Sequence, residues 1–204
     1  MQFEDSLSVP DHFYRNHLPH FDPKDAPYFV TYRLNGSIPN AQLQPLIERH
    51  KSAETELDQQ RLFDAFDALL HTNGPYHLQR AEIRDILIDS LAHLDRNEIQ
   101  LYAYAIMPNH VHAVFDLRSG RKLYEVMQSH KTYTARRANS VLGSVGQFWQ
   151  RETYDRVVRK GRLGPAIWYT IFNPVKAGLV RNWEDWPGTY LAPDCRLALG
   201  LDAV

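Results

Sequence analysis

The sequence predicts an α+β fold, in which helices cover mainly one face of an antiparallel sheet. Two neighbouring segments of alternating apolar residues, 99–106 and 110–117, are joined by a tight connection and predict a β-hairpin. Two amphipathic stretches, about residues 79–95 and 121–142, carry apolar side chains at helical spacing. Packing the apolar stripes of helices on a small sheet is the simplest way to bury both patterns.

The remaining segments follow the same two periodicities. Residues 29–34 are rich in β-branched and aromatic side chains and stop at Asn35-Gly36, which predicts the first strand. Residues 41–71 have a helical composition, with their acids expected on the surface, that ends before Asn73-Gly74-Pro75. Residues 148–158 predict a further strand or extended segment.

For two of the predicted helices, the sequence also indicates which side chains are buried or where the helix begins and ends. The helix over residues 121–142 is expected to bury five apolar side chains: Leu123, Val126, Met127, Tyr133 and Val141. A last helix would begin at Pro165, because proline is tolerated at the first helical position. We expect that helix to stop at Pro174, because proline inside a helix lacks a backbone donor and clashes with the preceding turn.

Length and composition indicate one folded domain over residues 1–204, with an arm at 1–27 and a tail at 191–204. Hydrophobic residues make up 44% of the chain and charged residues 23%, which argues against global disorder. The sequence has no apolar signal segment and no window near the ~20 apolar residues of a membrane span. We therefore expect a cytoplasmic protein, and the single cysteine, Cys195, excludes an internal disulfide.

Charge is unevenly distributed along the chain, although the net charge is only −1. Between Arg118 and Arg162, eleven Lys or Arg residues stand against three acids, a local balance of +8. Residues 1–100 carry nine basic and sixteen acidic side chains, a balance of −7. A basic surface beside an acidic body suits a polyanion such as nucleic acid. Ordinary solvated helix faces would explain the same counts, so charge alone leaves both interpretations open.

Two alternate histidines begin the second strand of the predicted hairpin. If residues 110–117 are extended, His110 and His112 lie on one face, roughly 6–7 Å apart at their Cα atoms. The apolar side chains between and after them point to the other face and would pack on helices. Two imidazoles can hold one divalent cation, but many such pairs are only polar residues on a solvated sheet face. A metal site therefore needs a third ligand from elsewhere.

The last predicted helix offers that ligand. Tyr169 and Asn173 stand at positions i and i+4, so they lie on one helix face. Asn173 would give the cation an oxygen ligand, and Tyr169 would stand one turn away as a nucleophile. Because the reference pKa of tyrosine is about 10, attack by Tyr169 needs the field of the cation or a nearby base.

Three blocks of sequence stand out in a fixed order. They are residues 106–112 (Ile-Met-Pro-Asn-His-Val-His), residues 148–150 (Phe-Trp-Gln) and residues 169–180 (Tyr-Thr-Ile-Phe-Asn-Pro-Val-Lys-Ala-Gly-Leu-Val). Together they resemble the REP-associated tyrosine transposases, relatives of the single-tyrosine insertion-sequence transposases within the HUH endonuclease superfamily. The resemblance covers about residues 29–186, and it departs in the long helical insertion at 41–71, in the arm and after Tyr190.

The resemblance implies a ferredoxin-like fold of the HUH endonuclease type and an enzyme that nicks and rejoins DNA. By this resemblance His110, His112 and Asn173 bind Mg²⁺ or Mn²⁺, the latter substituting well because Mg²⁺ prefers oxygen ligands. Tyr169 then attacks a phosphodiester and leaves a 5′-phosphotyrosine and a free 3′-hydroxyl. The implied substrate is single-stranded or hairpin DNA of the repetitive extragenic palindrome (REP) type, in the nucleoid.

Ten basic residues are candidates for contacts with DNA. Six lie in or beside the helix predicted over residues 121–142, three in the next extended segment and its loop, and one in the arm: Arg118, Arg121, Lys122, Lys131, Arg136, Arg137, Arg156, Arg159, Lys160 and Arg15. Plain surface charge is the alternative for each of them. For the patch around Arg15, fastening the arm to the core is the other possible role.

Alternatives to these assignments stay open. Tyr133, among basic residues, and Tyr154, beside Asp155, compete with Tyr169 as nucleophile. A non-catalytic DNA-binding module and a replication or conjugation nickase compete as functions. We expect a monomer rather than a homodimer, because folding back of the loop at residues 158–164 would let Tyr169 reach the histidines of its own chain.

Overall fold

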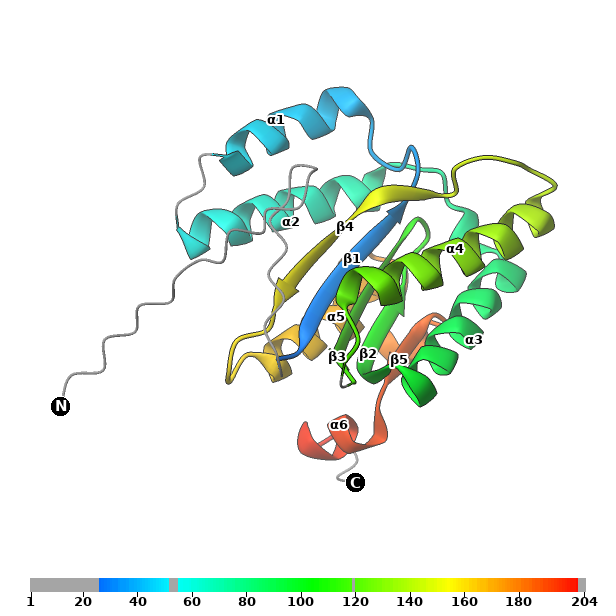
Figure 1. The fold of residues 1–204 in the computed structure, drawn as a ribbon. Coiled ribbons are helices and arrows are strands. Elements are labelled where there is room, and N and C mark those ends of the chain that lie inside the picture. The colour runs from blue at the N-terminus through cyan, green and yellow to red at the C-terminus, as the bar shows by residue number, and fades with distance from the viewer. Residues whose placement is uncertain (1–25, 52–54, 119, 202–204) are drawn as a thin grey trace.

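A five-stranded antiparallel sheet with the strand order β4-β1-β3-β2-β5 forms the centre of the protein (Figure 1). The computed structural model describes residues 26–51, 55–118 and 120–201. The strands are β1 (Tyr28–Leu34), β2 (Ile99–Ile106), β3 (His110–Leu117), β4 (Trp149–Val157) and β5 (Thr189–Leu191). β1 and β3 are neighbours in the interior of the sheet, with Thr31 opposite His112.

Within the described residues, six α-helices surround this sheet. They are α1 (Asn40–Lys51), α2 (Glu56–Thr72), α3 (Ala81–Asn97), α4 (Leu123–Leu142), α5 (Leu163–Lys176) and α6 (Pro193–Ala198). In Figure 1, α3 and α4 lie in front of the sheet and α5 lies behind it. The predicted α+β class, with an antiparallel sheet and packed helices, is confirmed, and the hairpin strands β2 and β3 have the predicted bounds.

Each face of the sheet has a core of its own. On one face Tyr32, Val111 and Phe115 pack with apolar side chains of α3 and α4. On the other face Phe29 and Val114 pack with side chains of α2 and α5. The sequence predicted helices mainly on one face, whereas the structure divides them between the two. The reason is that the interior strands are buried on both faces, and every residue of β1 is buried.

The end of α5 corrects one sequence-based expectation. Pro174 does not stop the helix, which continues to Lys176. The residue that terminates the helix is Gly178, which follows the C-cap Ala177 and has a left-handed φ of +70°. The N–H of Gly178 donates to the carbonyl of Val175, and the N–H of Leu179 donates to that of Pro174, both at 2.9 Å. This Schellman motif satisfies the last carbonyls, and it keeps the proline inside the final turn.

The buried face of α4 is a second correction. Tyr133 is 51% exposed and Val141 is 37% exposed, although both were predicted to lie in the core. The buried stripe instead continues through two polar residues. His130 Nε2 hydrogen-bonds with Tyr32 Oη at 2.8 Å, and Thr134 Oγ1 accepts from Trp149 Nε1 at 2.9 Å. Hydrophobicity alone assigned the wrong face, because buried polar groups with partners hold this helix to the sheet.

The insertion and the chain ends differ in detail from the prediction. The helical region expected at residues 41–71 consists of two helices, α1 and α2. The stretch expected to be a tail begins at the end of the edge strand β5 and includes α6. Residues 1–25 of the predicted arm, which include Arg15, lie outside the described residues. None of the described helices has the length and apolar character needed to cross a membrane.

Replacement of Gly178 by alanine is expected to lower the free energy of unfolding by about 1 kcal/mol, because the left-handed backbone disfavours a Cβ. An added Cβ would meet no atom within 4 Å, so the cost arises from the backbone alone. Gly164→Ala, in the same helix, is the matched control. Its Cβ would lie 3.9 Å from Leu199 Cδ2, an ordinary contact, and should cost nothing. Equal losses of stability in urea unfolding would contradict this account.

Candidate metal and tyrosine site

The turn between β2 and β3 fixes the start of the histidine strand. The N–H of Met107 donates to the carbonyl of His110 at 2.8 Å, which closes the turn. Asn109 is fully buried, and its side-chain amide donates to the carbonyls of Leu70, at 2.8 Å, and Asn73. These hydrogen bonds tie the turn to the end of α2, a segment far away in the sequence. They therefore fix the position of this helix relative to the sheet.

Both histidines point into the same buried space, as the alternation of strand residues predicted. His110 Nδ1 lies 2.7 Å from Asn109 Oδ1, and His112 Nδ1 lies 2.7 Å from Thr31 Oγ1. Because an amide oxygen only accepts, His110 carries a proton on Nδ1 and turns the lone pair of Nε2 inward. The two Nε2 atoms lie 3.1 Å apart, and both rings are fully buried. Hydrogen bonds that fix the outer nitrogen are typical of histidines that bind metals.

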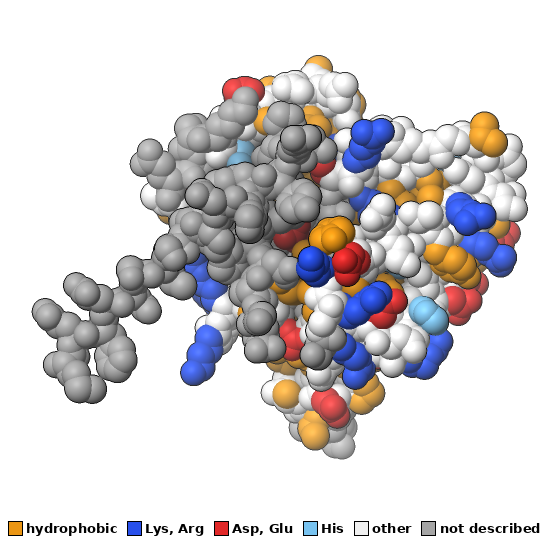
Figure 2. All heavy atoms as spheres, in the orientation of Figure 1, with side chains coloured by type: hydrophobic (Ala, Val, Ile, Leu, Met, Phe, Trp, Pro, Cys, Tyr) orange, Lys and Arg blue, Asp and Glu red, His pale blue; other side chains and the backbone are white. Residues whose placement is uncertain are grey.

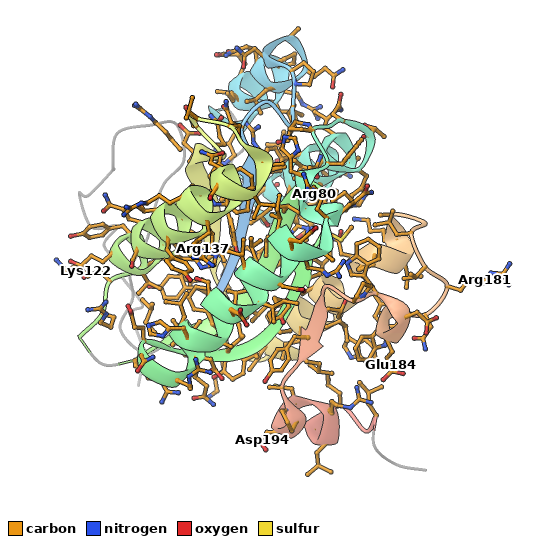
Figure 3. All side chains as sticks on the ribbon, turned by 90° about the vertical axis from the view of Figure 1, so that its right-hand side faces the viewer. Arg80, Lys122, Arg137, Arg181, Glu184 and Asp194 are labelled. Carbon is orange, nitrogen blue, oxygen red and sulfur yellow. The ribbon has the colours of Figure 1, made fainter. Side chains whose placement is uncertain are left out.

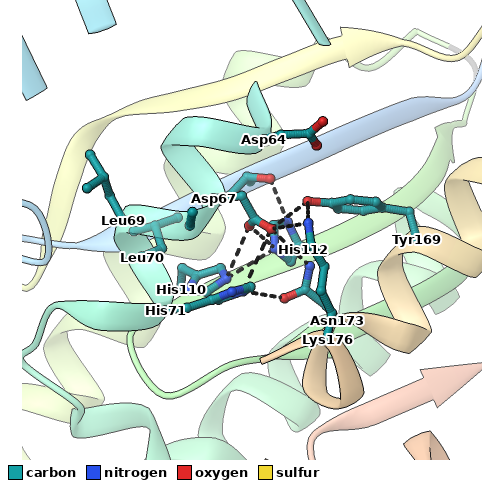
Figure 4. A network of polar contacts seen from close by, with 12 residues as sticks. Asp64, Asp67, Leu69, Leu70, His71, His110, His112, Tyr169, Asn173 and Lys176 are labelled. Carbon is teal, nitrogen blue, oxygen red and sulfur yellow. Dashed lines mark hydrogen bonds and ion pairs between the residues drawn. The ribbon is translucent and has the colours of Figure 1, made fainter. Parts of the chain in front are cut away.

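A carboxylate that the sequence analysis did not select completes this cluster. Asp67, on α2, is fully buried (Figure 4). Its Oδ1 lies 3.1 Å from His112 Nε2 and 3.9 Å from His110 Nε2. Asp67 was missed because the acids of residues 41–71 were assigned to the surface. The available signal was its spacing, since Asp67 falls four residues after Phe63 and three before Leu70, on the buried stripe of α2.

Helix α5 brings Tyr169 and Asn173 to the same carboxylate. Tyr169 Oη donates to Asp67 Oδ2 at 2.6 Å. Asn173 is fully buried, and its Nδ2 lies 3.5 Å from the same oxygen. Its Oδ1 lies 2.9 Å from Nε2 of His71, a second residue of α2. The phenol, the amide and the histidine pair that the sequence singled out thus meet within one chain (Figure 4).

Lys176 adds a positive charge at the edge of the site. Its Nζ lies 3.2 Å from Asp67 Oδ2 and 3.4 Å from Tyr169 Oη, and it stands 4.8 Å from the centre of the Tyr169 ring. Lys176 is two turns after Tyr169 on α5, and its side chain is 47% exposed. A cation that is half in solvent beside a phenol can reach an anionic group that approaches from outside.

Burial and mutual contact set the protonation of these groups. Burial alone would raise the pKa of Asp67, but interactions with His112 and His110 and the hydrogen bond from Tyr169 hold that pKa well below its usual range. Burial, helped by His112, lowers the pKa of His110. Burial and then the charge of Asp67 raise the pKa of Tyr169. At neutral pH the site therefore presents an ionised carboxylate, a neutral His110 and a protonated phenol.

These residues fit a divalent cation. One ligand atom each from Asp67, His110 and His112 can be chosen so that all lie within 4.8 Å of one another. Asp67 Oδ1 is buried, and no described donor is aligned to hydrogen-bond with it, so it is an acceptor in need of a positive partner. An ionised carboxylate beside two imidazoles suits several divalent metals, Mn²⁺ among them, and does not select one.

Three of the basic residues predicted to contact DNA are engaged in holding the fold. Arg118 donates to the carbonyls of Ile99 and Asp95, both at 2.7 Å, and Arg121 forms an ion pair with Glu98. Lys131 donates to the backbone carbonyls of β4, at 2.7 Å to Gln150 and 2.9 Å to Arg151. Burial, with the charge of Arg33, lowers the pKa of Lys131 to about 8.

The other predicted DNA contacts divide between two surfaces. Lys122, the N-cap of α4, and Arg136 and Arg137 within it are exposed, and this helix covers the sheet face opposite to the candidate site (Figure 3). In Figure 2 the Lys and Arg side chains on that face are scattered among acidic and neutral ones. Arg156 and Arg159 lie on the side of the site, where they line a cavity that Tyr169 also lines. A contact of any of these residues with DNA stays a prediction.

The rival tyrosines occupy different places. Tyr133 is exposed on α4, on the far side of the sheet. Tyr154, on β4, packs against Phe63 with ring centroids 4.8 Å apart and lies on the face of the site. Tyr169 is the described tyrosine whose hydroxyl donates to Asp67, and its ring centroid lies 5.8 Å from that of His112.

Comparisons with known proteins show what part of the chain is similar to in sequence and what the chain is similar to in fold. The family model described as IS200-like transposase matches residues 77–161. Among curated proteins, none matches the chain. A solved REP-associated tyrosine transposase bound to a REP hairpin is 18% identical, with a TM-score of 0.53 over 91% of this chain and 87% of that chain. A putative transposase from Deinococcus radiodurans R1 is 14% identical, with a TM-score of 0.34 over 74% of this chain and 89% of that chain.

Asp67→Asn is expected to lower the affinity for Mn²⁺ at least tenfold, because it removes the charged ligand of the cluster. The affinity is measured by calorimetric titration of the metal-free protein. Asp64→Asn is the matched control, since Asp64 is an exposed acid one turn earlier on α2 (Figure 4). Unchanged binding in Asp67→Asn, or an equal loss in both variants, would remove Asp67 from the metal site.

Proposed function

This chain resembles the IS200-like transposases in sequence and the REP-associated tyrosine transposases in fold, and from this premise we propose that it nicks and rejoins single-stranded DNA. The proposed enzyme depends on a divalent metal, acts at REP-type hairpins in the cytoplasm, and passes through a 5′-phosphotyrosine intermediate. One observation carries the proposal. Tyr169 Oη lies 2.6 Å from a carboxylate whose other oxygen lies 3.1 Å from His112 Nε2, so nucleophile and metal donors form one cluster.

We propose that Asp67 Oδ1 and the Nε2 atoms of His110 and His112 hold the cation, Mg²⁺ or Mn²⁺. Asn173 stands beside them, and rotation of its amide would turn Oδ1 toward the same space as an additional ligand. The metal, when bound, neutralises negative charge that grows on the phosphate during attack. Asp67 replaces Asn173 as the first candidate for the third ligand, since it is ionised and already lies beside both histidines.

Tyr169 is the proposed nucleophile. Its oxygen attacks the phosphorus of a phosphodiester, a P–O bond forms to tyrosine, and the bond from phosphorus to the 3′-oxygen breaks. The products are a 5′-phosphotyrosine and a free 3′-hydroxyl, and attack by another 3′-hydroxyl reverses the step without ATP. Asp67 Oδ2 already accepts the hydrogen bond of the phenol, so it is the atom placed to receive the proton. One chain supplies every group, which supports a monomer as the active unit.

The proposed substrate follows from the site and from the fold match. Attack by a buried phenol needs an accessible backbone, which single strands and the feet of hairpins provide more readily than duplex DNA. The solved structure with the matching fold was bound to a REP hairpin, and this supports the same class of ligand here. Arg156 and Arg159, which line the same cavity as Tyr169, are the preferred candidates for phosphate contacts, together with Lys160, the next residue in the chain.

Incubation with labelled hairpin DNA and Mn²⁺ is expected to give a covalent protein–DNA adduct, which a denaturing gel separates from free DNA. Tyr169→Phe should abolish the adduct, because the phenol oxygen that forms the bond is gone. Tyr133→Phe and Tyr154→Phe are the controls and should keep it. An adduct that persists in Tyr169→Phe would assign the nucleophile elsewhere, and hairpin binding without any adduct would favour a non-catalytic DNA-binding module.

Lys176→Met is expected to slow adduct formation by about 100-fold, because it removes a charge-assisted donor 3.4 Å from the attacking oxygen. Lys176→Arg keeps the charge and should recover most of the rate. Single-turnover cleavage under saturating DNA measures the step directly. A methionine variant as fast as the wild type would exclude Lys176 from the reaction.

A further inference from the structure

A large cavity of about 1250 Å³ opens beside the candidate site. It lies between α1 and α2 on one side and the sheet face of β1 and β4 on the other, and it extends to the start of α5. Tyr169 and Thr31 belong to both the cavity wall and the site, so the two spaces are continuous. Pockets for small ligands measure roughly 300–1,000 Å³, and this groove is larger.

A buried arginine lines the groove. Arg33, on β1, is only 7% exposed. Its one hydrogen bond within the described residues runs from Nη1 to Ser37 Oγ at 3.1 Å, and no described acid forms an ion pair with it. A guanidinium has five N–H donors, and a buried charge without a partner is costly. Burial lowers the pKa of Arg33, and the charge of Glu152 opposes that effect. The donors of Arg33 therefore call for an anion, and their planar fork matches a phosphate.

The rest of the lining combines aromatic and apolar side chains with further arginines and with two acids, Glu152 and Asp155. Phe66 on α2 lies beside Arg33, whose guanidinium carbon is 6.0 Å from the ring centroid, and Tyr154 lies across the groove on β4. Both rings are partly exposed. Leucines and an isoleucine of α1 add an apolar wall, and Arg156 and Arg162 also line the cavity. Basic side chains with aromatic faces are the combination that binds phosphates and unstacked bases together.

We propose that this groove binds the single-stranded DNA next to the scissile phosphate, with a phosphate on Arg33 and a base against Phe66. The proposal rests on the function proposed above and deepens it, since it names where the strand leaves the catalytic centre. Duplex DNA is excluded as the occupant, because its paired and stacked bases offer no free face to Phe66 or Tyr154. Four arginines line the groove against two acids, and this positive balance favours a polyanion over an apolar partner.

The test measures hairpin binding by fluorescence anisotropy in EDTA, with oligonucleotides that carry either a blunt foot or a short single-stranded tail on one side or the other. A tail on one side should raise the affinity of the wild type about tenfold. Phe66→Leu and Arg33→Gln should each lose most of this gain while keeping the affinity for the blunt hairpin. Arg181→Gln, which removes an exposed charge far outside the groove (Figure 3), should keep the gain.

An abasic tail separates the two contacts. It keeps its phosphates, so Phe66→Leu and the wild type should bind it equally, whereas Arg33→Gln should still bind it more weakly. A wild type that gains nothing from either tail, or variants that keep the full gain, would overturn the groove assignment. The adduct gel with Tyr169 reports separately on catalysis, so an active enzyme with a tail-independent affinity refutes the groove alone.

Discussion

The buried carboxylate of Asp67 is the interaction on which the arrangement of this protein depends. A fully buried charge is costly unless it is paired, and here three elements share the pairing. β3 contributes His112, α5 contributes Tyr169 and Lys176, and α2 contributes the carboxylate itself. Because His112 lies 45 residues and Lys176 lies 109 residues after Asp67 in the sequence, the charge joins the insertion, the hairpin and the last long helix into one structure.

The same constraint links stability to the proposed chemistry. Tyr169 is held by Asp67 in its protonated form, since burial and the carboxylate both raise its pKa. Asp67 Oδ1, in contrast, faces the histidine nitrogens and lacks an aligned donor. A cation at this point would satisfy that oxygen and weaken the hold of the carboxylate on the phenol. In the proposed reaction, binding of a metal would thus prepare Tyr169 for attack, and the strands β1 and β3 would keep the donors in place.

The positions of several residues followed from local patterns. Alternation along the hairpin placed His110 and His112 on one face, and helical spacing placed Tyr169 and Asn173 on another, as the structure has them. Patterns of hydrophobicity failed where polar groups are buried with partners. Asp67 was assigned to the surface, and the buried face of α4 was displaced because His130 and Thr134 were not expected inside. Burial of a polar group depends on what lies across from it, which a local pattern does not contain.

The sequence by itself determined the two hairpin strands, the helices α3 and α4 and the candidate site residues of β3 and α5, because backbone periodicity and turn chemistry act over a few neighbours. Only the tertiary structure decided that α2 crosses the histidine face and delivers Asp67, and that a groove containing Arg33 opens beside Tyr169. It also divided the predicted basic residues between scaffold and surface. These outcomes depend on contacts between segments far apart in the chain, whose free energies exist only once the helices have packed on the sheet.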